Sequence, residues 1–183
     1  VHGVDGMSGV SFPDPTAAVD QVGAVEALLR ISRDEPGRHT LVTLGPLTNI
    51  ALAVSIDPEF LTRFEHVVAM AGAFDGVGNV HRVGEFNVWA DPEAAKIAID
   101  APGLITFLGW DMSRQYAVVT PDEQAALRGL GRFGEFAVDI NRCVDDFARV
   151  HNGLAGYDLP DPLAMAVAID PDVVTARRSV HLD

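Results

Sequence analysis

Asn79, Glu85 and Asn87 are the residues whose types and spacing point most directly to chemistry. They occur in the glycine-containing stretch 78–92, which follows an apolar run at 66–71. Glu85 and Asn87 are two positions apart, so on extended backbone their side chains point to the same face. A carboxylate accepts hydrogen bonds from hydroxyls, and a carboxamide both donates and accepts them. The three side chains therefore suit a neutral, polyhydroxylated ligand.

Short runs of β-branched and apolar residues alternate along the chain with segments of helical periodicity. The runs at 39–44, 66–71 and 104–108 predict buried strands, and 173–182 reads as the start of another. Helices are expected over 16–33, 50–54, 91–99, 121–130, 132–150 and 163–169. This alternation predicts an α/β fold with an open, mainly parallel sheet flanked by helices. In such a sheet, ligands bind in the loops that follow the strands.

The composition limits the classes of partner. The chain has 183 residues, 48% of them hydrophobic, which is enough for a sizeable core. Asp and Glu number 26 and Lys and Arg number 13, so the formal charge is −13. Phosphate backbones repel so acidic a chain, and we therefore expect no nucleic-acid partner, whereas a hard cation would find oxygen ligands. No apolar run reaches membrane-spanning length, so no membrane partner is expected.

The cysteine content and the chain ends bear on compartment and domain organisation. The single cysteine, Cys143, excludes an internal disulfide framework and fits a reducing compartment. The chain starts at Val1 in a glycine-rich loop, without a signal segment, and its last residues read as a strand cut short. We therefore expect residues 1–183 to form a single incomplete domain of a longer, cytoplasmic protein.

Six ordered motifs carry a resemblance to a known family. They lie at residues 2–6, 40–51, 70–79, 85–95, 109–111 and 161–164, and so extend over nearly the whole chain. Gly-Pro-Leu-Thr-Asn at 45–49 and Glu-Phe-Asn-Val-Trp-Ala-Asp-Pro-Glu-Ala-Ala at 85–95 are the most specific of them. With these motifs the sequence resembles the inosine-uridine-preferring nucleoside hydrolase family. The resemblance implies a Rossmann-like α/β domain.

The resemblance also implies an activity and a metal. Family members hydrolyse the N-glycosidic bond of ribonucleosides to ribose and free base, in purine and pyrimidine salvage, with one Ca²⁺ in the site. Asp161 matches the family's late aspartate ligand, and Leu44 matches the residue whose backbone carbonyl also coordinates the ion. Both supply the oxygen atoms that Ca²⁺ prefers. Taken alone, an aspartate before a helix is most often an N-cap.

The resemblance also implies which residues contact the substrate. Asn79, Glu85 and Asn87 match the groups that bind the ribose hydroxyls, and Met70 matches a residue that lines the ribose pocket. His2 matches a histidine on the base side, where an imidazole suits protonation of the departing base near neutral pH. Taken alone, a histidine in such a loop is usually only solvated.

Two departures from the family pattern limit these expectations. The family's aspartate cluster, which supplies further metal carboxylates and the general base, lies upstream of Val1 in complete members, so we expect the chain by itself to be inactive. Many members also have a histidine before the late aspartate as the leaving-group acid, and here that position is Pro160, which cannot donate a proton. These departures leave an alternative open, a non-catalytic nucleoside- or sugar-binding protein on the same scaffold.

Two properties of the protein remain general expectations. The resemblance implies a homo-oligomer, a dimer or a tetramer. The sequence leaves open whether the base of the ribonucleoside is a purine or a pyrimidine.

Overall fold

The computed structural model describes residues 2–182 and divides them into two compact units. The sheet unit comprises Asp20–Met112 and the residues from Pro160 onward. The helical unit comprises the residues up to Val19 and Ser113–Leu159. That residues 1–183 form a single incomplete domain stays a prediction.

The sheet unit is built on three parallel strands in the order β1-β2-β3. β1 (Thr40–Thr43) pairs with β2 (His66–Met70), and β2 pairs with β3 (Thr106–Leu108). The register aligns Thr40 with His66 and Val68 with Thr106. Each strand coincides with a predicted apolar run, so the predicted α/β fold with a parallel sheet is confirmed.

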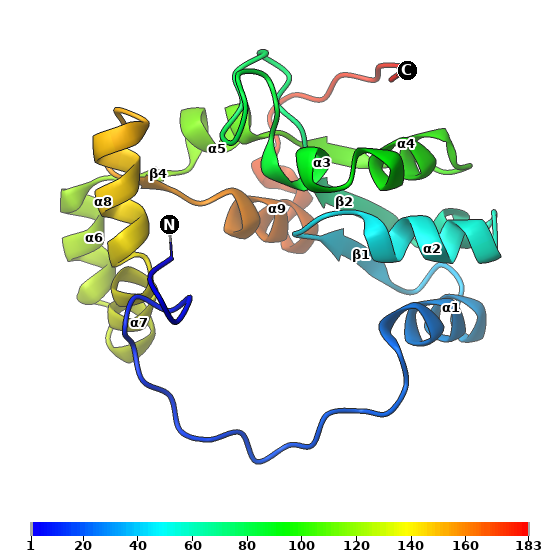
Figure 1. Ribbon diagram of the computed structural model, residues 1–183, viewed down its shortest axis with the longest axis horizontal. Coiled ribbons are helices and arrows are strands. Elements are labelled where there is room, and N and C mark those ends of the chain that lie inside the picture. The colour runs from blue at the N-terminus through cyan, green and yellow to red at the C-terminus, as the bar shows by residue number, and fades with distance from the viewer. Residues whose placement is uncertain (1, 183) are drawn as a thin grey trace. The chain divides into compact units, whose positions relative to one another are not determined.

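Helices cover both faces of this sheet. α1 (Ala24–Asp34), α2 (Thr48–Ile56), the 3-10 helix η1 (Phe60–Arg63) and α4 (Pro92–Asp100) share one core with Leu41 and Val67. α9 (Pro160–Ile169) shares a second core with Val68 and Met70. Val67 and Val68 thus face opposite sides, as strand alternation requires. α2 and α4 lie side by side on their face (Figure 1).

The helical unit contains three helices and a short antiparallel ribbon. The helices are α6 (Pro121–Arg128), α7 (Arg132–Ile140) and α8 (Arg142–His151). The ribbon pairs β4 (Val118–Val119) with β5 (Tyr157–Asp158). α5 (Trp110–Tyr116) runs from the sheet unit into the helical unit. Thr120 caps α6 in a reciprocal box with Glu123, which explains why the predicted start at 121 is correct.

Four sequence predictions differ from the structure. The helix expected from residue 16 begins only at Ala24, because residues 11–20 are exposed and give a helix nothing to pack against. The helix expected over 132–150 is broken at Asn141. The strand expected over 173–182 is instead the 3-10 helix η2 (Pro171–Val173) followed by irregular backbone, since it has no strand partner among the described residues. The stretch predicted as extended around Glu85 contains the short helix α3 (Phe86–Ala90).

Asp57 joins three elements of the sheet unit through its carboxylate. It follows α2 and accepts hydrogen bonds from Arg33 on α1 (2.6 Å) and from Arg63 at the end of η1 (3.0 Å). The hydrogen bonds from Arg63, and then from Arg33, lower the pKa of Asp57 from 3.8 to about 2. The folded state therefore holds the ionised carboxylate more strongly than the unfolded chain does.

Asp57→Asn is expected to lower the melting temperature near neutral pH and to change it less as the medium becomes acidic. A carboxylate with a depressed pKa stabilises the fold above its unfolded pKa, near 4, and this contribution is lost as the pH falls through its folded pKa of about 2. Thermal unfolding of both proteins between about pH 7 and pH 2 measures the difference. Asp34→Asn, an exposed aspartate at the end of α1, is the control. A difference in melting temperature between Asp57→Asn and the wild type that does not change with pH would contradict the lowered pKa of Asp57.

Candidate functional site

The carboxyl edge of the parallel sheet carries the first group of predicted residues. Leu44 directly follows β1 and Met70 is the last residue of β2, so both lie at the edge where the strands end. Asp161 is the second residue of α9, which packs on β2 through Ala164 and Val167. The structure therefore brings Leu44 and Met70 to one edge and Asp161 to the first turn of a helix that covers the same strand.

Glu85 is the buried N-cap of α3. Only 3% of its surface is exposed. One carboxylate oxygen accepts the Asn87 N–H (2.8 Å), and the other accepts the N–H groups of Val88 (3.2 Å) and Gly72 (2.9 Å). Glu85 itself has extended backbone, but α3 begins at the next residue, Phe86, so the predicted extended stretch that would place Glu85 and Asn87 on one face is wrong. Three backbone donors explain how this carboxylate is buried with no cationic partner among residues 2–182.

Asn87 is fixed by Met70. Its Nδ2 donates to the Met70 backbone carbonyl (2.9 Å) and lies 3.3 Å from the Met70 sulfur. Both residues are buried, with 6% of Asn87 and 3% of Met70 exposed. A carboxamide whose nitrogen is committed in this way has a fixed oxygen, Oδ1, on its other side. Asn87 therefore presents an oriented acceptor next to the end of β2.

Asn79 stands in an exposed turn and holds the entrance of α3. Its Oδ1 accepts the Phe86 N–H (2.8 Å). The turn closes on itself, since Asn79 N–H donates to the Gly84 carbonyl (3.1 Å) and Gly84 N–H donates to the His81 carbonyl (3.2 Å). The loop between β2 and α3 is thus a defined structure rather than a polar linker.

Sequence reasoning gave no role to the motif at 109–111, which anchors the start of this loop. Trp110 N–H donates to the Gly72 carbonyl (2.9 Å), and the Asp111 carboxylate accepts the Phe74 N–H (3.0 Å). A Cβ added at Gly109 would overlap both Asp111 and the Phe74 ring. The motif was visible in the sequence, but its contact with residues 72–74 depends on the β2–β3 pairing.

Thr48 and Asp91 make a second connection that the sequence did not reveal. The Thr48 hydroxyl, at the start of α2, donates to the Asp91 carboxylate, which also accepts the Ala94 N–H (3.0 Å) and so caps α4. The Thr48 and Ala94 hydrogen bonds lower the pKa of Asp91. This carboxylate ties the segment that follows Leu44 to the segment that carries Asn87.

The comparisons with known proteins identify the family of the chain. The sequence matches the inosine-uridine preferring nucleoside hydrolase family over residues 1–183. The chain belongs to this family. The match extends from the His2 loop of the helical unit to α9 of the sheet unit, so both units are parts of the nucleoside hydrolase sequence pattern.

Relatives and solved structures of nucleoside hydrolases resemble the chain over nearly its whole length. Uridine nucleosidase 1 of Arabidopsis thaliana is 31% identical, with 98% of this chain and 54% of that protein covered. The inosine-uridine preferring nucleoside hydrolase of Leishmania major is 36% identical, covering 97% and 57%. The structure of the purine-preferring ribonucleoside hydrolase from Gardnerella vaginalis superimposes with a TM-score of 0.86 at 32% identity, covering 95% and 55%. The chain spans about half the length of the curated relatives it matches.

The metal that the family resemblance implies is not accommodated by the described residues alone. Among residues 2–182 there is no group of three or more His, Cys, Asp or Glu side chains placed to hold a metal ion. Leu44 and Asp161 offer a carbonyl and a carboxylate, whereas Ca²⁺ takes about six to eight oxygen ligands. A complete calcium site would need ligands beyond these two.

His2 belongs to the helical unit, so its distance from the sheet edge is not defined. Its side chain is exposed, and its carbonyl accepts the Ser8 N–H (3.1 Å). Pro160 is the first residue of α9, a position where a missing backbone N–H costs nothing. The base-side role of His2 stays a prediction.

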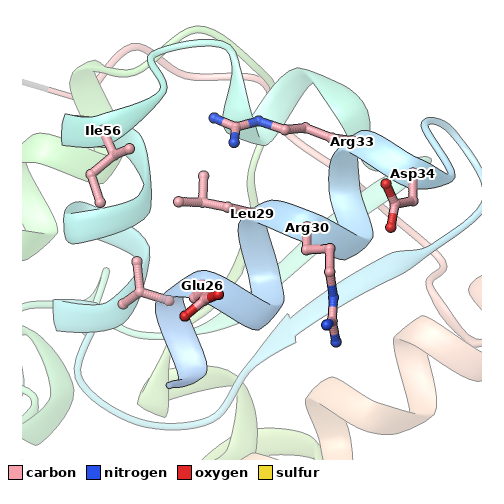
Figure 2. A pocket seen from close by; sticks show the side chains of 7 residues that line it. Glu26, Leu29, Arg30, Arg33, Asp34 and Ile56 are labelled. Carbon is pink, nitrogen blue, oxygen red and sulfur yellow. The ribbon is translucent and has the colours of Figure 1, made fainter. Parts of the chain in front are cut away.

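An open groove between α1 and α2 is separate from all of these residues. Leu29 and Ile56 point toward each other across it (Figure 2). It is lined by Val25, Glu26, Leu29, Arg30, Arg33, Asp34 and Ile56. None of these is a predicted site residue, so the groove is not assigned to the nucleoside. Among the described residues, no helix has the length and apolar character needed to cross a membrane.

Proposed function

We propose that the protein hydrolyses the N-glycosidic bond of ribonucleosides, releasing ribose and the free base. The observation that carries the proposal is the Asn87 carboxamide, oriented by the Met70 carbonyl at the end of β2 and adjoining the buried Glu85. An oriented amide oxygen at the carboxyl edge of a parallel sheet suits recognition of a sugar hydroxyl. Membership in the nucleoside hydrolase family supports a nucleoside as the source of that sugar.

The reaction adds water across one bond. A water oxygen bonds to C1′ of the ribose while the bond from C1′ to the base nitrogen breaks, and the base leaves with that electron pair. One water proton is lost to a base, and the departing nitrogen takes up a proton. The transition state is oxocarbenium-like, so the fixed Asn87 oxygen and the Glu85 carboxylate would stabilise positive charge on the sugar ring. Asn79 would contribute by holding the entrance of α3.

The proton for the departing base is proposed to involve His2. Pro160 cannot serve, because its side chain has no proton to donate. An imidazole near neutral pH can protonate a leaving nitrogen or donate a hydrogen bond to it. His2 is the residue that the family pattern assigns to the base side of the pocket.

We further propose that the whole protein holds Ca²⁺, with the Leu44 carbonyl and the Asp161 carboxylate among its ligands. When bound, such an ion binds ribose hydroxyls and acidifies a water. The remaining ligands would come from residues outside the described chain.

The oligomeric state, the biological role and the cellular location of the whole protein are further proposals. The relatives bear names that specify uridine, inosine-uridine and purine preference, so the base is left open. Family resemblance supports a homo-oligomer and a role in nucleoside salvage. The single free Cys143 supports a reducing, cytoplasmic location.

A second candidate function is nucleoside or sugar binding without catalysis. Pro160 favours it, because the leaving-group acid of many family members is missing there. The lack of a carboxylate cluster among residues 2–182 favours it too. Binding would use the same Asn87 and Met70 arrangement.

The two candidates are separated by ribose release from the full-length protein. With Ca²⁺ present, the protein is expected to release ribose from at least one of five nucleosides: inosine, adenosine, guanosine, uridine and cytidine. A chelator should abolish the release and added Ca²⁺ should restore it. Binding of a nucleoside by calorimetry with no ribose released from any of the five would favour the binding protein and contradict the hydrolase.

A further inference from the structure

The break between α7 and α8 is not explained by the helices themselves. α7 ends at Ile140 and α8 begins at Arg142, within a stretch whose pattern predicts one helix. Asn141, between them, gives α8 no side-chain cap, and its Nδ2 donates to the Ala137 carbonyl (2.8 Å). The last carbonyls of one helix and the first N–H groups of the next need partners from elsewhere.

Ser8 supplies those partners from the other end of the helical unit's sequence. Its hydroxyl donates to the Ile140 carbonyl (2.7 Å) and accepts the Cys143 N–H (3.2 Å). One oxygen atom thus pairs with one carbonyl at the end of α7 and with one N–H at the start of α8. Arg142 donates to the Ser8 carbonyl (2.5 Å), so the backbone of Ser8 is held at the same junction.

The backbone of Ser8 is held in a conformation that serine rarely adopts. Its φ is +53°, and it is the non-glycine residue with positive φ among the described residues. It is also 3% exposed. A left-handed conformation costs energy for a residue with a Cβ and persists where the surroundings require it. The contacts at the α7–α8 junction are those surroundings.

Ser8 also anchors the loop that carries His2. Ser8 N–H donates to the His2 carbonyl (3.1 Å), and the Asp5 carboxylate accepts the N–H groups of Met7 (2.9 Å) and Gly9 (3.0 Å). These bonds make residues 2–9 one compact loop whose attachment to the helices is Ser8. The His2 side chain itself is exposed and makes no described contact that would hold it.

We propose that Ser8 is a positioning residue for cleavage of the nucleoside, which fastens the 2–9 loop to the α7–α8 junction and thereby fixes the backbone of His2, the residue proposed to serve the departing base. The inference rests on the proposed function, since it assigns Ser8 to the leaving-group step of that reaction. Ser8 touches neither base nor sugar in this role. Its effect is transmitted through the His2 backbone.

The test uses the full-length protein with Ca²⁺ and two substrates that differ in the leaving group. A nucleoside base needs a proton as it departs, whereas p-nitrophenolate, from p-nitrophenyl β-D-ribofuranoside, is a stable anion that needs none. Ser8→Ala is expected to lower kcat for the best nucleoside about tenfold, the order expected for a misplaced catalytic group. It should leave hydrolysis of the nitrophenyl riboside within about twofold. Ser8→Gly, which accepts the positive φ but lacks the hydroxyl, should behave in the same way.

A double-mutant cycle with His2→Ala shows whether Ser8 acts through His2. If it does, Ser8→Ala adds almost nothing to His2→Ala, because the two residues share one effect. Ser32→Ala is the matched control, since Ser32 is 1% exposed and its hydroxyl donates only to the Leu29 carbonyl of its own helix. Equal losses on both substrates, no loss in either Ser8 variant, or additive losses with His2→Ala would overturn the inference while leaving the hydrolase intact. A wild-type protein that cleaves neither substrate would overturn the proposed function, and this inference with it.

Discussion

Replacing Glu85 with alanine is expected to lower the free energy of unfolding by about 3 kcal/mol, from a lost helix cap and buried donors left without an acceptor. The reason is that three backbone N–H groups, those of Gly72, Asn87 and Val88, share this carboxylate in a site that is 3% exposed. Urea denaturation followed by tryptophan fluorescence measures the change. The chain has two tryptophans, Trp89 on α3 and Trp110 at the Gly72 anchor, and both report on this region.

Glu85→Gln separates the charge from the cap. Glutamine keeps one acceptor oxygen but turns an NH₂ group toward at least one N–H donor. The free energy of unfolding of Glu85→Gln should therefore lie between those of the wild type and Glu85→Ala. Glu65→Ala is the control, because Glu65 is exposed and a surface change of this kind alters stability by about 0.5 kcal/mol or less. A Glu85→Ala protein as stable as the wild type would show that the carboxylate is not required by the fold.

Replacing Asn87 with alanine is expected to lower kcat/KM of the full-length protein about 100-fold, the order seen when one preorganised polar group is removed from an active site. The carboxamide oxygen is aimed by the hydrogen bond from Nδ2 to the Met70 carbonyl (2.9 Å). Asn87→Asp should lose at least as much, because it sets a carboxylate oxygen against that carbonyl oxygen. Steady-state kinetics of ribose release, with folding checked by circular dichroism, measures both variants.

Gln124→Ala is the matched control for Asn87. The Gln124 carboxamide also donates to a backbone carbonyl, that of Val119 (3.3 Å), but it lies in the helical unit on α6. Its removal should cost some stability and leave kcat/KM near that of the wild type. If Asn87→Asp kept full activity, the oriented amide would not be the group that binds the sugar.

The sequence was sufficient for the sheet, because the β-branched runs that form β1, β2 and β3 are signals within a few residues. It was also sufficient for the starts of α4 and α6, which the structure shows capped by Asp91 and Thr120. It missed α3, since a buried glutamate is an uncommon N-cap and its polar neighbours resemble a loop. The long helix predicted over 132–150 was wrong for a non-local reason. At its break, the Ile140 carbonyl is paired with the hydroxyl of Ser8, more than 130 residues away in the sequence.

The sequence named the candidate site residues but not the contacts that hold them, and their roles in binding ribose stay predictions. The motifs drew attention to Asn79, Glu85 and Asn87, yet all three were expected to face the ligand directly. In the structure the Glu85 carboxylate and the Asn79 oxygen accept hydrogen bonds from backbone N–H groups. The Asn87 carboxamide is instead oriented by the hydrogen bond from its Nδ2 to the Met70 carbonyl. Contacts such as Asp111 with Phe74 follow from tertiary packing and have no signature in neighbouring residues.

The anchored loop between β2 and α3 has a consequence for the energetics of binding. Its first residues are held by Glu85, Trp110 and Asp111, and its last by the bond from Phe86 to Asn79. The backbone is therefore ordered before any ligand arrives, and folding has already removed its conformational entropy. A ligand that reaches the Asn87 oxygen does not have to immobilise this segment. More of its contact energy is then available as affinity or for distortion of the bound sugar.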